Sequence, residues 1–215
     1  MKMNKKITTL LAAAVCAGSM VLPVCASTTY SLDEIKMSVN FNDSFTILTR
    51  DNLYGAEQMA LLESVDSDPE EELTFMKSND IYVEGIDNET GIFVQVLADY
   101  GYVDDMDTVD LEDVKQALEQ TFAGTGTTMT SDVYIYQHND NARYLCYDIY
   151  SDAQGAGQVY TTIQNDYSIS FTFSTYESTI SSEAMDTINE VVESAVYGNI
   201  RFSTPNFEDI FIPAN

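Results

Sequence analysis

The densest group of chemically capable side chains is a run of acids near the middle of the chain. It comprises Asp104, Asp105, Asp107 and Asp110, followed by Glu112 and Asp113. Carboxylate oxygens at this density could hold calcium, but the spacing lacks the alternating acids, central Gly and closing Glu of an EF-hand. Acids at a helix start are also stabilised by the helix dipole without any ion. The sequence therefore leaves a weak calcium site and helix capping as two interpretations.

Groups suited to covalent or acid–base catalysis are few. The single histidine, His138, lies beside a polar turn, and no nucleophile-elbow sequence brings it to a hydroxyl and a carboxylate. Cys146 has apolar and aromatic neighbours, a setting in which a thiol is usually an inert small hydrophobe. Acid pairs are common in so acidic a chain, yet Glu84 and Asp99 near strand ends could serve an extracellular hydrolase. We therefore expect a non-catalytic protein without a cofactor, with this hydrolase as the alternative.

Aromatic residues provide the candidate binding groups. Eight tyrosines lie between residues 134 and 176, at positions 134, 136, 144, 147, 150, 160, 167 and 176. Tyr suits both sheet packing and protein interfaces, and alternation places Tyr144 and Tyr150 on one face of a predicted strand. Phe207 and Phe211 belong to an aromatic C-terminal segment. These four residues are candidate binding residues. The alternative for the tyrosines is ordinary sheet packing, and the alternative for the two Phe residues is docking of the C-terminal segment on the domain.

Charge excludes some classes of partner. The chain of 215 residues has 35 acidic and 9 basic side chains, a net charge of −26. No basic patch can replace the counterions of a nucleic acid, and an anionic membrane surface would repel the protein. The acids are spread along the chain, which is typical of a solvated surface. A docking face for cations or basic partners is the other interpretation.

The first 26 residues have the pattern of a secretory signal. Lys2, Lys5 and Lys6 precede an apolar stretch, and Val24-Cys25-Ala26 ends it, so we expect cleavage after Ala26. The apolar core is about 15 residues, short of the ~20 of a membrane span. The sequence predicts a secreted protein, with association to the cell envelope possible and no membrane span after cleavage. A retained N-terminal anchor is the alternative.

Domain organisation beyond the signal is simple. Residues 27–36 form a short polar leader in this interpretation, residues 37–198 one domain, and residues 199–215 the aromatic tail. The apolar content of 45% and the length suit a single core of ordinary size. Neither repeats nor low-complexity runs divide the chain.

Elements of the first half follow from apolar runs and capping residues. Runs at 37–41 and 45–48 predict a hairpin, and residues 53–65 a helix. Asp68, Pro69 and Glu71 form a capping box for a second helix. Runs at 81–86 and 92–98 predict two strands joined by a polar loop.

Elements of the second half are more regular. Residues 110–122 carry an apolar stripe and predict a helix, and residues 132–137, 143–150, 158–164 and 167–174 predict a four-strand meander. The last of these strands alternates Tyr, Ile and Phe with Ser and Thr, typical of a sheet with one buried face. A final helix is expected from Ser181 to Gly198. This order predicts an α+β fold with helices packed on a mainly antiparallel sheet.

Two segments carry a family resemblance. Residues 41–51 (FNDSFTILTRD) and 70–83 (EEELTFMKSNDIYV) resemble exported, uncharacterised proteins of Gram-positive bacteria, and the later Tyr134-Ile135-Tyr136 and Arg143-Tyr144 hairpin keeps the same order. This organisation is similar to the PsbP-like fold, an α/β/α sandwich named for a photosystem II subunit, with a nuclear-transport factor among its relatives. The resemblance covers about residues 37–197 and implies a scaffold used for protein binding. It transfers no functional residue. We therefore expect a secreted domain that binds a protein or a cell-envelope component.

Overall fold

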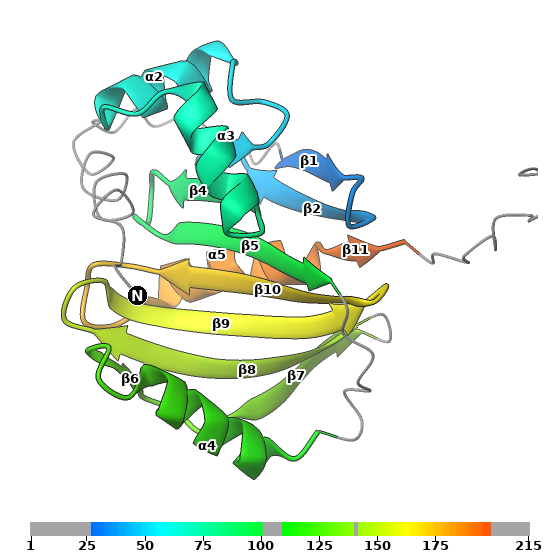
Figure 1. The fold of residues 1–215 in the computed structure, drawn as a ribbon, viewed down its shortest axis with the longest axis vertical. Coiled ribbons are helices and arrows are strands. Elements are labelled where there is room, and N and C mark those ends of the chain that lie inside the picture. Colours follow the sequence, from blue (N-terminus) through cyan, green and yellow to red (C-terminus); the bar gives the residue numbers. More distant parts are fainter. Residues whose placement is uncertain (1–26, 101–108, 140–141, 199–215) are drawn as a thin grey trace, which may run out of the picture.

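The computed structural model describes residues 27–100, 109–139 and 142–198. These residues form an eight-stranded sheet, a three-stranded sheet and four helices (Figure 1). Every strand pairing is antiparallel. The α+β class predicted from the sequence is therefore confirmed. The expected signal (1–26) and tail (199–215) lie outside the described residues.

The large sheet has the strand order β3-β4-β5-β10-β9-β8-β6, and β7 also pairs with β8. Its strands are β3 (Phe45–Thr49), β4 (Ile81–Asp87), β5 (Phe93–Tyr100), β6 (Thr127–Met129), β7 (Tyr134–Asn139), β8 (Ala142–Ser151), β9 (Gly155–Gln164) and β10 (Tyr167–Ser174). Strands β7 to β10 are the predicted meander, and β4 and β5 the predicted pair. Because β10 also pairs with β5, it joins the two halves of the chain in one sheet.

Helix α5 (Ser182–Glu193) covers one face of this sheet. The alternation in β10 places Phe171 and Phe173 in the core on that face, both 0% exposed, with Ile188 of the helix. Ser181 starts α5 by accepting a hydrogen bond from the Ala184 N–H. The helix ends at Glu193 rather than at Gly198 as predicted. The chain instead forms the short strand β11 (Val196–Tyr197), because the edge of β2 is there to pair with it.

The small sheet has the order β1-β2-β11, with β1 at Ser27–Leu32 and β2 at Met37–Asn42. The stretch expected as a polar leader thus includes a strand that pairs with β2 along its whole length. The predicted hairpin of β2 with β3 is wrong, because β3 pairs with β4. The burial patterns give the reason: β2 alternates between buried and half-buried residues, whereas all five residues of β3 are buried in the larger sheet.

Three helices lie on the opposite face of the large sheet (Figure 1). Helices α2 (Ala56–Ser64) and α3 (Pro69–Ser78) cover its β3–β4 end through a second apolar cluster, and α4 (Leu111–Phe122) lies over its β6–β8 end. Asp68 caps α3 as predicted, accepting from the N–H groups of Glu70 and Glu71 at 2.9 Å. Helix α2 is shorter than expected, since Leu53 is buried in the turn before it.

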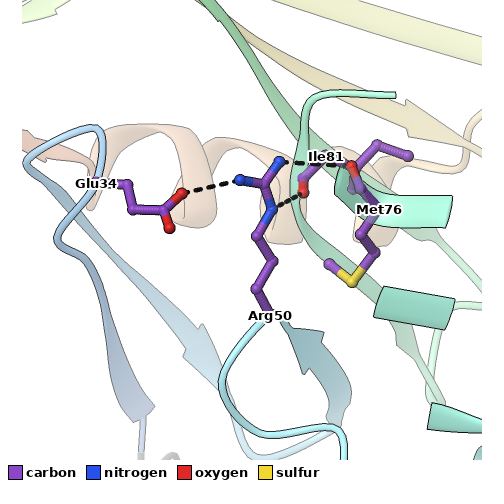
Figure 2. A network of polar contacts seen from close by, with 4 residues as sticks. All are labelled: Glu34, Arg50, Met76 and Ile81. Carbon is purple, nitrogen blue, oxygen red and sulfur yellow. Dashed lines mark hydrogen bonds and ion pairs between the residues drawn. The ribbon is translucent and has the colours of Figure 1, made fainter. Parts of the chain in front are cut away.

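Arg50, just after β3, links several elements (Figure 2). Its Nε donates to the Ile81 carbonyl at 2.8 Å, and one terminal nitrogen lies 2.9 Å from the Glu34 carboxylate in the β1–β2 turn. The other terminal nitrogen donates to the Met76 carbonyl at 3.4 Å, and the guanidinium lies 3.7 Å from the centre of the Tyr82 ring. The Arg50 side chain thus links the small sheet, α3 and β4. Within the described ranges, no helix is long and apolar enough to cross a membrane.

Candidate binding pocket beside helix α5

A pocket of about 400 Å³ lies where β8 and β9 meet the segment that leads into α5. This volume is within the range of ordinary ligand pockets. Its lining combines polar side chains with aliphatic ones: Thr130, Asp148, Ile149, Tyr150, Ala156, Gly157, Gln158, Ser178, Thr179, Ile180 and Met185. The pocket therefore offers both apolar surface and several oxygens for hydrogen bonds.

The strand register explains why the polar residues meet. Asp148 of β8 lies opposite Gln158 of β9, and Tyr150 lies opposite Ala156. Because residues two apart on a strand share a face, Asp148 and Tyr150 point to the side on which α5 packs. Helix α5 covers this face over the earlier part of β8, around Tyr144. Because the helix begins beside the pocket, it leaves Asp148 and Tyr150 half-buried.

A tight glycine turn holds the segment before α5 against the sheet. Gly155 has a φ of +72°, and a Cβ placed there would lie 2.1 Å from the Thr175 carbonyl oxygen. The Ala156 N–H donates to the Glu177 carbonyl, and the Thr175 N–H donates to the Ala156 carbonyl, both at 2.9 Å. These bonds fix the segment that brings Ser178, Thr179 and Ile180 to the pocket.

A hydrogen-bond network around Gln158 orients the polar side chains of the pocket. The Gln158 amide nitrogen donates to Asp148 Oδ1 at 2.9 Å and to the Tyr134 hydroxyl at 3.2 Å. Its amide oxygen accepts from the Tyr160 hydroxyl at 2.8 Å. Burial raises the pKa of Tyr134 to about 12 and that of Tyr160 as well, so both hydroxyls stay protonated at neutral pH. Among the residues that line the pocket, Asp148 is the only carboxylate.

The thiol nearest to this network is not reactive. Cys146 is two residues from Asp148 on β8 and is 0% exposed. Burial raises the pKa of its thiol to about 12, and a protonated thiol is a poor nucleophile. Over the ranges that the structure describes, no group of three or more His, Cys, Asp or Glu side chains could hold a metal ion.

A pair of carboxylates, Glu84 and Glu72, lies on the opposite face of the sheet, beneath α3. Glu84 of β4 is 2% exposed and accepts a hydrogen bond of 2.5 Å from the Gln95 amide. Burial, and next the neighbouring Glu72, raise the pKa of Glu84 to about 8, while the Gln95 hydrogen bond lowers it. Glu72 of α3 is itself only 3% exposed. Together the two acids form a covered pair that takes up a proton.

The structure does not bring the predicted hydrolase acids together. Gln95 lies opposite Glu84, and Asp99 lies four residues further along β5. At about 3.3 Å per residue, this is roughly 13 Å along the strand. The paired carboxylates of glycosidases are at most about 9.5 Å apart. Glu84 is also buried, whereas Asp99 is exposed.

The four residues predicted to bind a partner differ in where they lie. Tyr150 lines the pocket. Tyr144 is 3% exposed, and its hydroxyl lies 3.0 Å from the Tyr197 hydroxyl in the core. It cannot serve as a surface binding residue, because α5 and the end of the domain cover that part of the face. Phe207 and Phe211 lie outside the described residues.

The predicted calcium ligands are only partly described. Asp110 caps α4: its carboxylate accepts from the Glu112 N–H at 2.9 Å and from the Asp113 N–H at 3.4 Å. This is the capping interpretation of the acidic run. Asp104, Asp105 and Asp107 lie outside the described residues.

Of the lining residues, sequence reasoning named Tyr150 alone, and it missed the hydrogen-bonded pair Asp148 and Gln158. The strands that carry them were predicted, and the short turn between these strands limits the register. Pairing across that turn could have placed both residues beside Tyr150.

No protein-family model and no curated protein matches this chain. Among solved structures, cyanobacterial PsbP (CyanoP) from Synechocystis sp. PCC 6803 is similar, with a TM-score of 0.51 and 14% sequence identity. The match covers 85% of this chain and 99% of CyanoP. The Ran-binding protein Mog1p from Saccharomyces cerevisiae matches with a TM-score of 0.43 and 8% identity over 80% of this chain and 96% of Mog1p. The likeness to CyanoP shows that the chain has the PsbP-like fold.

Proposed function

We propose that this protein is a secreted, non-catalytic binding domain that holds part of a protein or cell-envelope component in the pocket beside α5. The pocket is the observation that carries the proposal. It combines aliphatic side chains with a few oriented polar groups, the composition of binding sites for specific ligands. Two side chains near the pocket belong to types that can react. Cys146 is buried and protonated, and Asp148 accepts a hydrogen bond from the Gln158 amide.

Other features support the cellular setting of this proposal. The first 26 residues have the pattern of a secretory signal, and the resemblance noted above is to exported bacterial proteins. The net charge of −26 argues against nucleic acid as the partner. Sequencing the N-terminus of protein recovered from the culture medium tests secretion: we expect it to begin at Ser27.

Capture from envelope extracts with the full-length mature protein tests the binding site. We expect a partner that the wild type retains to be lost with Tyr150→Ala. Tyr176→Ala is the matched control, because Tyr176 is 41% exposed and does not line the pocket. Recovery of the same partner by all three proteins would remove the pocket from consideration. Turnover in a hydrolase screen that is abolished by Glu84→Gln would overturn the non-catalytic proposal.

A further inference from the structure

We propose that the pocket beside α5 takes the side chain of a Lys or Arg from the partner, with its charged end on Asp148. This inference rests on the proposed function and names the chemistry that the site recognises. Asp148 is the only carboxylate in the lining, and no Lys, Arg or His lines the pocket among the described residues. A cation entering the pocket therefore meets an anion without a competing internal partner.

The Asp148 carboxylate is oriented to receive such a group. Its Oδ1 accepts from the Gln158 amide at 2.9 Å, the one hydrogen bond of this carboxylate within the described part of the chain. Gln158 is 5% exposed and is held in turn by Tyr134 and Tyr160. The second carboxylate oxygen remains for a ligand. A carboxylate fixed before binding loses little conformational entropy when a cation arrives.

The rest of the lining suits the long stem of a basic side chain. Ile180 and Met185 supply aliphatic surface beside the hydroxyls of Tyr150 and Thr179. Lys and Arg bury their methylene groups along apolar surface and keep the charged end among polar groups. Hydroxyl oxygens can accept hydrogen bonds from the ammonium or guanidinium group.

Charge around the pocket favours the same class of ligand. Asp152 and Glu177 are exposed on the segments that border it, and Glu183 is in the first turn of α5. With 35 acids to 9 bases, the field of the whole chain attracts cations. The N-terminus of α5 would by itself favour an anion, but Ser181 caps it and Glu183 offsets its positive end.

Nuclear magnetic resonance titration of the mature protein with short peptides tests the inference. The probe is Ac-Ala-Leu-Lys-Leu-Ala-NH₂, and its counterpart with norleucine keeps the methylene groups but lacks the charge. We expect the Lys peptide to shift the backbone resonances of residues 148–158 and to bind about five- to ten-fold more tightly, the scale of one typical net hydrogen bond. A peptide with Glu in place of Lys should bind more weakly than either.

Asp148→Asn separates charge from structure. The Asn oxygen can still accept from Gln158, so the fold should persist, and an unchanged spectrum away from the pocket verifies this. We expect this variant to lose the preference for Lys over norleucine. Asp152→Asn is the matched control, since it removes one nearby exposed charge outside the lining, and it should keep the preference.

Three outcomes would overturn the inference: equal binding of the Lys and norleucine peptides, tighter binding of the Glu peptide, or equal effects of the two Asp variants. The inference can also fail while the proposed function stands. A partner that is lost with Tyr150→Ala but retained in full by Asp148→Asn would keep the pocket as the binding site while removing the cation from its ligand.

Discussion

Two Gln–carboxylate pairs lie on opposite faces of the large sheet and differ in their surroundings. Gln95 donates to Glu84 beneath α3, and Gln158 donates to Asp148 beside the start of α5. Glu84 is 2% exposed with a second acid against it, whereas Asp148 is half-buried at an open pocket. The same two chemical groups thus form a sealed structural pair on one face and a ligand-accessible pair on the other.

The covering helix accounts for the difference. Helix α3 extends over Glu84 and contributes Glu72, so desolvation raises the pKa of Glu84 to about 8. Near Asp148 the chain has only reached the segment before α5, and the site stays open. Burial rather than residue type decides which carboxylate can meet a ligand.

Weakening the packing of α3, the helix that covers Glu84, should have the largest effect. Met76 of α3 is 0% exposed and packs with Leu48 and Leu62. We expect Met76→Ala to lower the free energy of unfolding by about 2–5 kcal/mol, the cost of a buried large-to-small change. Urea titration measures this loss. Met185→Ala, a half-buried methionine at the pocket, is the matched control and should cost clearly less. Equal losses would show that the two sites are covered alike.

The second prediction concerns the proton held by Glu84. Its pKa is about 8 in the folded protein and near the ordinary 4.5 in the unfolded chain, so the folded state holds a proton that the unfolded state has lost between these values. The free energy of unfolding therefore falls as the pH rises from about 4.5 to about 8. We expect Glu84→Gln to remove this fall and to raise stability at pH 9 by about 2 kcal/mol or more.

Urea titrations from pH 4 to pH 9 measure that difference between wild type and variant. Glu119→Gln, an exposed change of the same kind on α4, should follow the wild-type curve. If the Glu84→Gln protein keeps the wild-type slope between pH 5 and pH 8, the buried pair does not hold the proton.

The smallest effect is expected at the other pair. Gln158→Leu leaves the buried Tyr160 hydroxyl without its acceptor and should cost about 1–2 kcal/mol with little dependence on pH. Thermal or urea unfolding is the measurement. Gln164→Leu lies on the same strand, where the amide makes one long hydrogen bond of 3.4 Å, and should stay within about 0.5 kcal/mol of wild type. A loss at Gln164 as large as that at Gln158 would contradict the assigned role of the network.

Local patterns predicted most of the fold. The helix cap at Asp68, the helix from Leu111 to Phe122 and the alternation in β10 are each determined by neighbouring residues, and each is confirmed. The pairing of β2 was missed for two reasons: β1 was interpreted as a polar leader, and β11 comes more than 150 residues after β2. The long-range pairing with β11 leaves little trace in any short window of sequence.

The pocket was predictable only in part. Alternation correctly placed Tyr144 and Tyr150 on one face of β8, but the sequence could not show where α5 begins to cover that face. The helix boundary buries Tyr144 and leaves Tyr150 at the pocket. The raised pKa of Glu84 was equally hidden, since it depends first on burial beneath α3 and next on Glu72 of that separate helix.

Strand β2 has a further consequence for how the protein is made. Its two neighbours are β1, which precedes it, and β11, which comes more than 150 residues later. A ribosome synthesises β11 only after every other described element. The small sheet therefore cannot be completed during most of translation. Strand β2 has both of its neighbours only after Tyr197 has been synthesised.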